Sequence, residues 1–183
     1  MKLSKARIQP LTESEWTPEQ RETLEARHKE GIVYNVMGTL AQHWEASKKF
    51  NVWAFHVMGD TQTIVPRERE LLILRIGWLC QAEYEWGQHV LFGREAGLTE
   101  EEIARIKKGP DDPGWDAFDA HLLRAADELH SDALISDATW AALSERYSTQ
   151  QLMDVVFTVG QYNMVSMALN TFGVQLDKGV KGF

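Results

Sequence analysis

The chain has 183 residues, of which 44% are hydrophobic and 25% are charged, and its formal net charge is −8. This length fits one domain that buries about 70% of the surface of its unfolded chain, so we expect an ordinary globular protein. The acidic balance argues against a nucleic-acid binder, because such proteins neutralise phosphates with Lys and Arg. No signal peptide is visible, and no apolar stretch approaches the about 20 residues that span a bilayer. We therefore expect a cytoplasmic protein with no membrane partner.

Helix-capping signals define the first half of the chain. Thr17 and Pro18 begin a helix that we expect to continue to about His28 and to end at Gly31. Apolar residues recur at helical spacing over 35–59, which predicts two helices or one broken helix. A proline at position 66 opens the next helix, and another follows over 82–96.

The second half continues the same pattern without any sustained strand alternation. Further helices are expected over 99–109, 116–130, 136–147 and 149–170, the last one terminated by Gly173. We therefore predict an all-α fold with about eight helices. Because the segment 149–170 is apolar on most of its faces, it requires burial on all sides, and a subunit interface would provide it.

Known chemical motifs are mostly absent. Cys80 is the only cysteine, so a disulfide within the chain and intrachain dithiol chemistry are excluded. The sequence has no zinc motif, no phosphate-binding glycine loop and no serine-hydrolase motif. We therefore predict no metal site.

One polar group inside the apolar helices could carry out chemistry. Glu85 and His89 are four residues apart on one helix face, and Glu70 lies on the preceding helix. A carboxylate beside an imidazole orients the ring and raises its pKa, which suits general acid–base catalysis. The simpler alternative is a solvated pair that contributes about 0.2–0.5 kcal/mol, with Glu70 as surface charge. Tyr84 and Trp86 flank Glu85 and are candidates for substrate binding, although packing in the core is the more common role.

The segment 66–103 resembles the carboxymuconolactone decarboxylase family, which includes the AhpD-like alkylhydroperoxidases. The resemblance extends over residues 35–174 and leaves 1–34 as an N-terminal extension with one helix, beside a domain over 35–183. In the peroxidase branch, a Glu, a Cys-x-x-Cys pair and a His follow at fixed spacing. The Glu and His fall on Glu70 and His89, but the two cysteine positions fall on Ala82 and Glu85.

The decarboxylase branch fits better. Its resemblance lies in Arg-Glu-Leu at 69–71, in Glu83 and Glu85, in His89 and in the segment 96–103. It implies an AhpD-like fold that assembles as a homo-oligomer, a trimer or a hexamer. It further implies a small-molecule substrate from the catabolism of aromatic acids.

The resemblance suggests a lyase that removes CO2 from a lactone or a related carboxylic acid. His89, held by Glu85 or Glu70, would supply the proton, with no cofactor because the substrate itself accepts the electrons. Two alternatives stay open. One is a non-catalytic, oligomeric binding protein of the same fold, and the other is an alkylhydroperoxidase-like antioxidant protein, which the missing thiol pair opposes.

Overall fold

A computed structural model of the chain describes residues 3–25 and 33–183. In these residues all regular structure is helical, which confirms the all-α prediction. The elements are η1 (Glu13–Glu15), α1 (Pro18–Glu25), α2 (Asn35–Leu40), η2 (Ala41–His43), α3 (Trp44–Met58), α4 (Pro66–Leu79), α5 (Glu83–Glu95), α6 (Glu100–Ile106), α7 (Ala117–Asp132), α8 (Asp137–Ser144) and α9 (Thr149–Phe172). The expected end of the first helix near His28 and Gly31 lies outside the described residues.

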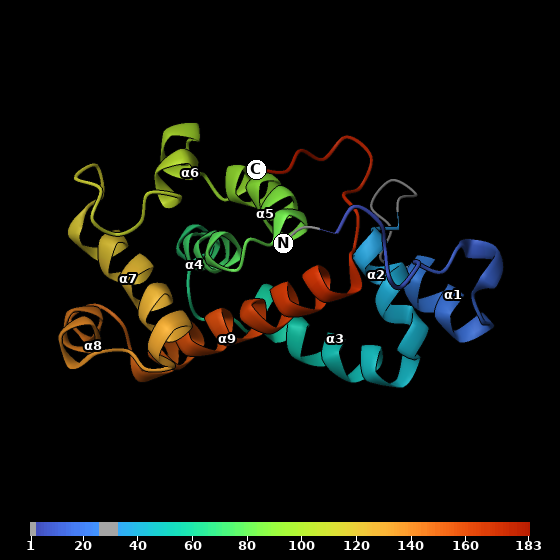
Figure 1. The fold of residues 1–183 in the computed structure, drawn as a ribbon. Coiled ribbons are helices and arrows are strands. Elements are labelled where there is room, and N and C mark those ends of the chain that lie inside the picture. Colours follow the sequence, from blue (N-terminus) through green and yellow to red (C-terminus); the bar gives the residue numbers. More distant parts are fainter. Residues whose placement is uncertain (1–2, 26–32) are drawn as a thin grey trace.

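Helix α4 forms the centre of the molecule. It packs against α5, α7 and α9, and Figure 1 shows these helices arranged around it. Its apolar residues are buried on all sides, which explains why they form a continuous run rather than one stripe. Five of them are 0% exposed: Leu71, Leu72, Ile73, Leu74 and Ile76. A helix packed in this way holds its polar side chains in fixed positions.

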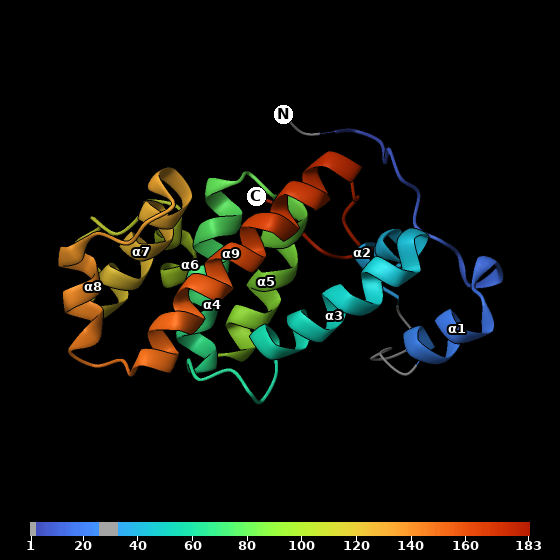
Figure 2. The same cartoon turned by 90° about the horizontal axis from the view of Figure 1, so that it is seen from below.

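The longest helix, α9, runs from beside α8 past α4 and α3 (Figures 1 and 2). Ser148 and Gln151 form the predicted capping box at its start. Gly173 ends it with a φ of 69°, and a Cβ atom there would lie 2.8 Å from the carbonyl oxygen of Lys5. Both the left-handed backbone and this close approach require glycine. No helix among the residues that the structure describes is long and apolar enough to cross a membrane.

The N-terminal segment has a small hydrophobic cluster of its own. Trp16 and Leu24 are buried there together with Ala41 of η2. The main core is formed by residues from Val57 onward. The division of the chain at residue 34 stays a prediction, because α2 and η2 contribute to the N-terminal cluster from the other side of that boundary.

Candidate functional site

The turn between α4 and α5 folds these two helices against each other. The Ala82 amide donates to the carbonyl oxygen of Gly77 at 2.9 Å, and Gln81 adopts a φ of 51° between them. A Cβ atom on Gly77 would lie 3.3 Å from Cγ of Glu85, so the glycine gives this side chain room against α4. The turn therefore brings polar side chains of the two helices within contact distance.

The three predicted catalytic residues meet at this place. Nδ1 of His89 forms a hydrogen bond of 2.7 Å with Oε2 of Glu70. Nε2 of His89 lies 2.9 Å from Oε1 of Glu85, an ion-pair distance without hydrogen-bond geometry. The three residues are 0%, 5% and 4% exposed, in the order Glu70, His89, Glu85. A solvated surface pair does not describe this arrangement.

The two carboxylates control the protonation of the imidazole. Burial lowers the pKa of His89, but the charges and contacts of Glu70 and Glu85 outweigh it and raise this pKa to about 10. His89 is therefore an imidazolium at neutral pH, with a carboxylate beside each ring nitrogen.

Aromatic rings complete the surroundings of His89. The ring of Tyr162 from α9 lies edge-on to the imidazole at a centroid distance of 4.8 Å, and that of Phe92 lies at 5.2 Å. Burial, together with the nearby carboxylates of Glu85 and Glu70, raises the pKa of Tyr162 well above its usual value. Tyr162 therefore stays a neutral phenol and adds no charge to the site.

A cavity of about 510 Å³ opens beside this cluster. Its described wall is formed by α1, α2, α3, α5 and α9 together with Tyr34, and it contains apolar side chains such as Leu40, Phe50 and Val165. Glu85 and His89 line the cavity, whereas Glu70 does not. Glu70 on α4 therefore contacts Nδ1 of His89 on the side away from the cavity, whereas Glu85 and His89 face the cavity.

Tyr84 lies in the wall of the same cavity, and its role in substrate binding stays a prediction. Its hydroxyl donates to Oδ2 of Asp177 at 2.5 Å, and the amide of Gln88 donates to the same oxygen at 2.7 Å. The other oxygen of Asp177 accepts the backbone amide of Asn35 at 2.8 Å. The C-terminal segment thereby fixes two side chains of the cavity wall.

The structure does not bring Trp86 into the cavity. Its ring packs against Trp78 and the C-terminal Phe183 at centroid distances of 5.7 and 5.9 Å. The ammonium group of Lys107 lies 4.8 Å from the same ring. Trp86 is buried on another face of α5, so its position fits core packing, the alternative that the sequence left open.

The sequence analysis did not identify Gln88, Gln161 or Asp177. Gln161 on α9 lines the cavity and is 5% exposed, and its Oε1 atom has no hydrogen-bond partner among the described residues. Helical spacing from Glu85 points to Gln88 and also to Phe92, since positions i+3 and i+7 share its face. Gln161 is a polar residue within a largely apolar helix, and such a residue is also a sequence signal for a functional position.

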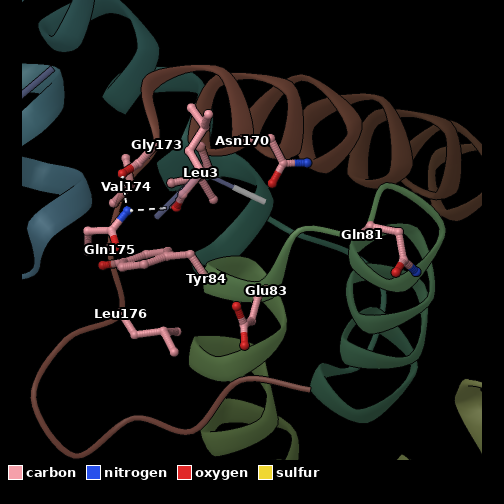
Figure 3. A pocket seen from close by; sticks show the side chains of 10 residues that line it. Leu3, Gln81, Glu83, Tyr84, Asn170, Gly173, Val174, Gln175 and Leu176 are labelled. Carbon is pink, nitrogen blue, oxygen red and sulfur yellow. Dashed lines mark hydrogen bonds between the residues drawn. The ribbon is translucent and has the colours of Figure 1, made fainter. Parts of the chain in front are cut away.

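A second, smaller pocket lies behind Tyr84. It has a volume of about 260 Å³ and polar walls that include Glu83, Asn170 and Gln175. Figure 3 shows Leu3 in this pocket, where its carbonyl oxygen accepts a hydrogen bond from the Gln175 amide at 3.3 Å. Tyr84 lines both spaces and is the wall between them.

Cys80 lies away from this site. Sγ of Cys80 lies 3.1 Å from Oδ1 of Asn163, and Cys80 does not line the cavity beside His89. Burial raises the pKa of this thiol. No group of three or more His, Cys, Asp or Glu side chains suited to a metal ion occurs in the described part of the chain.

Comparisons with known proteins agree with the resemblance seen in the sequence. The model of the carboxymuconolactone decarboxylase family matches residues 45–128, which include the three clustered side chains. A comparison with curated proteins finds no match.

Several solved structures have the same fold. A peroxidase-related protein from Ralstonia eutropha, described as an alkylhydroperoxidase AhpD core, is 17% identical with a TM-score of 0.81, covering 93% of each chain. A peroxidase-related protein from Silicibacter sp. is 17% identical with a TM-score of 0.82, covering 97% of this chain and 96% of its own. The debrominase Bmp8, in a complex with 2,3,4-tribromopyrrole, is 13% identical with a TM-score of 0.76, covering 96% and 94%. These similarities confirm the expected AhpD-like fold.

Proposed function

We propose that the chain is a cofactor-independent carboxy-lyase of the carboxymuconolactone decarboxylase family, whose model matches residues 45–128. Its substrate would be a lactone or a related carboxylic acid from the catabolism of aromatic compounds. The observation that supports this proposal is a buried imidazolium, held between two carboxylates, in the wall of a largely apolar cavity.

The proposed reaction has two steps. The bond between the ring carbon and the carboxylate breaks, CO2 leaves, and the electron pair passes into the conjugated carbonyl system of the substrate. The resulting dienolate then takes a proton on carbon from Nε2 of His89, and solvent later returns a proton to the imidazole. Loss of CO2 is favoured in a cavity that hydrates the carboxylate poorly.

Each carboxylate has a separate role in this scheme. Glu70 holds Nδ1 and fixes the ring, while Glu85 lies beside the proton that is transferred. Together they keep the imidazole protonated at neutral pH, so the acid is available in every cycle. Tyr84 would contribute to the wall that receives the substrate, and Trp86 would support α5 from its other side.

Peroxide reduction fits this chain less well, although two of its structural neighbours are described as peroxidase-related. Reduction by a dithiol needs two cysteines, and this chain has one, which lies outside the cavity.

Release of CO2 is the direct test of the proposed function. We expect the purified chain, without added metal or cofactor, to release CO2 from at least one member of a panel of carboxylated lactones. Turnover of an alkyl hydroperoxide with a dithiol donor, and no CO2 release, would favour the antioxidant alternative. Tight binding of an aromatic acid without any turnover would favour the binding-protein alternative.

We also propose that the chain forms a homo-oligomer, either a trimer or a hexamer, as the family resemblance implies. Helices α3 and α9 lie on the same side of the molecule (Figure 2), and both expose large apolar side chains. Phe55 is 55% exposed on α3, and Met164 and Met167 are 47% and 58% exposed on α9. Apolar surface of this kind is typical of an interface between copies.

Light scattering is therefore expected to give a mass that is a multiple of 20.9 kDa. Replacing Met167 with Glu on the proposed interface should reduce that mass. A wild-type chain that stays at the monomer mass at micromolar concentration would contradict the oligomer.

A further inference from the structure

We infer that a separate apolar pocket, next to the cavity at His89, is a subsite for an uncharged alkyl chain carried by the substrate. This inference rests on the proposed function and adds a substrate class to it, a lactone or carboxylic acid with an alkyl substituent. It follows from the position of the pocket and from the side chains that line it.

The apolar pocket adjoins the cavity directly. It has a volume of about 380 Å³, and its described wall comes from α2, η2, α3 and α9 with Ile8 and Val174. Five side chains line both spaces: Val36, Leu40, Ser47, Phe50 and Val165. The four apolar ones are only half-buried. A chain attached to a ring beside His89 can therefore extend from the cavity into the apolar pocket.

The buried polar side chains of this wall already have hydrogen-bond partners within the protein. The Thr39 hydroxyl donates to a backbone carbonyl oxygen one turn earlier at 2.8 Å, and Oγ of Ser47 accepts an amide one turn later at 3.4 Å. Except for Gln42 and His43, which are exposed, the rest of the described wall is apolar. The wall therefore offers a ligand mainly hydrocarbon surface, and cavities with such walls bind apolar groups.

The N-terminal segment is a built part of this wall. Ala6, Ile8 and Pro10 are half-buried, whereas residues 5, 7 and 9 are exposed, which is the alternation of an extended chain. The Ile8 amide donates to the carbonyl oxygen of Phe172 at 3.2 Å, and the amide of Leu11 donates to α2 at 3.0 Å. The segment thus connects the end of α9 with α2, and Ile8 between these bonds lines the pocket (Figure 2).

The volume of the pocket sets the size of its ligand. A dry cavity of about 150 Å³ binds benzene, so this pocket has room for an alkyl chain of about six to eight carbons. Complete burial of one methylene group favours binding about fourfold, which corresponds to about 0.8 kcal/mol. A substrate that fills the apolar pocket should therefore react faster at low concentration than the same ring without a chain.

A series of alkyl substituents tests this inference with one carboxylated lactone. The substituents are methyl, propyl, butyl and hexyl. We expect kcat/KM for CO2 release to rise at least about 10-fold from methyl to butyl, because three more methylene groups are buried. A kcat/KM that is independent of chain length, or that falls with it, would overturn the inference and leave the proposed function intact.

Filling the pocket from the protein side is the second test. Ala168 is half-buried on α9 and lines the apolar pocket but not the cavity at His89. In Ala168→Phe the ring occupies the space of the chain, so the ratio of kcat/KM for butyl to that for methyl should fall at least about 10-fold. Ala141→Phe, at an exposed position of α8, is the matched control and should leave this ratio unchanged. An unchanged ratio in a folded Ala168→Phe variant would overturn the inference.

A polar substitution in the N-terminal segment tests the same wall without altering a helix. Ile8→Asn places an amide among apolar groups and should lower the butyl-to-methyl ratio at least about fivefold. Leu134→Asn, at a leucine that is 67% exposed, is the matched control. A ratio in Ile8→Asn equal to that of the wild type would contradict the role of Ile8 in the subsite.

A second copy of the chain could cover the same pocket instead, because Met164 lines it and also belongs to the proposed interface. In that case Ala168→Phe would reduce the mass measured by light scattering, and kcat/KM would not depend on chain length. That pair of results would overturn the inference.

Calorimetry keeps the inference testable if no lactone is decarboxylated. The probes are methyl and butyl lactones without a carboxylate. The butyl probe should bind at least about 10-fold more tightly than the methyl probe, and Ala168→Phe should remove this difference, while the proposed function would fail. Equal binding of the two probes to the wild type would overturn the inference in that case as well.

Discussion

Replacing Glu85 with Gln is expected to lower kcat for CO2 release by about 10²–10⁴-fold, the usual effect of removing a group that takes part in proton transfer. The substitution keeps the size of the side chain but removes the charge next to Nε2 of His89. Because Gly77 leaves room for Cγ of Glu85, the glutamine should fit in the same place. The measurement is steady-state turnover of the best substrate, with KM determined separately.

The matched control is Glu95→Gln. Glu95 lies on the same helix but is exposed, so the same chemical change should leave kcat unchanged. His89→Gln is expected to lose as much activity as Glu85→Gln, since the two residues act together. Wild-type turnover in a correctly folded Glu85→Gln variant would remove Glu85 from the mechanism.

Stability is expected to fall as the pH rises from about 6.5 to about 10. The unfolded chain binds the His89 proton with a pKa of about 6.5, whereas the pKa of His89 in the folded chain is raised to about 10. The stabilisation is therefore complete below pH 6.5 and is lost progressively as the pH passes through the folded value. The difference between the two pKa values means that protonated His89 contributes on the order of 5 kcal/mol to the free energy of unfolding.

Urea unfolding at several pH values measures this dependence. Glu70→Gln should shift the pH range of the loss downward, because it removes the carboxylate that hydrogen-bonds Nδ1 of His89. The exposed Glu95→Gln variant should behave like the wild type, which separates the effect of His89 from other groups that titrate near pH 10. Equal pH dependence in the wild type and in Glu70→Gln would show that the imidazole does not depend on this carboxylate.

Local signals predicted most of the fold. The residues at helix starts, such as Thr99 and Ser148, form their caps within three residues, so the sequence alone specifies them. The spacing of Glu70, Glu85 and His89 also indicated one site, since the resemblance to the family links positions on two successive helices. Burial of Glu70 was harder to predict, because the charged residues around it are typical of an exposed helix start.

The wall of the cavity depends on orientation and on distant segments. With 100° between successive residues of a helix, Tyr84 and Trp86 point to different sides of α5 and cannot both flank one site. The sequence analysis proposed both, and only Tyr84 lines the cavity. Asp177 reaches Tyr84 from 93 positions away. No local pattern encodes such a contact, and the same holds for Gln161 of α9.

The protonation state of His89 is the measurement that tests the central claim most directly. Its ring nitrogens can be followed by ¹⁵N NMR against pH, with the signals assigned by comparison with His89→Gln. The account predicts an imidazolium that persists through neutral pH and loses its proton near pH 10. A ring that titrates near 6.5, or that is neutral at pH 7, would contradict a charge held between Glu70 and Glu85.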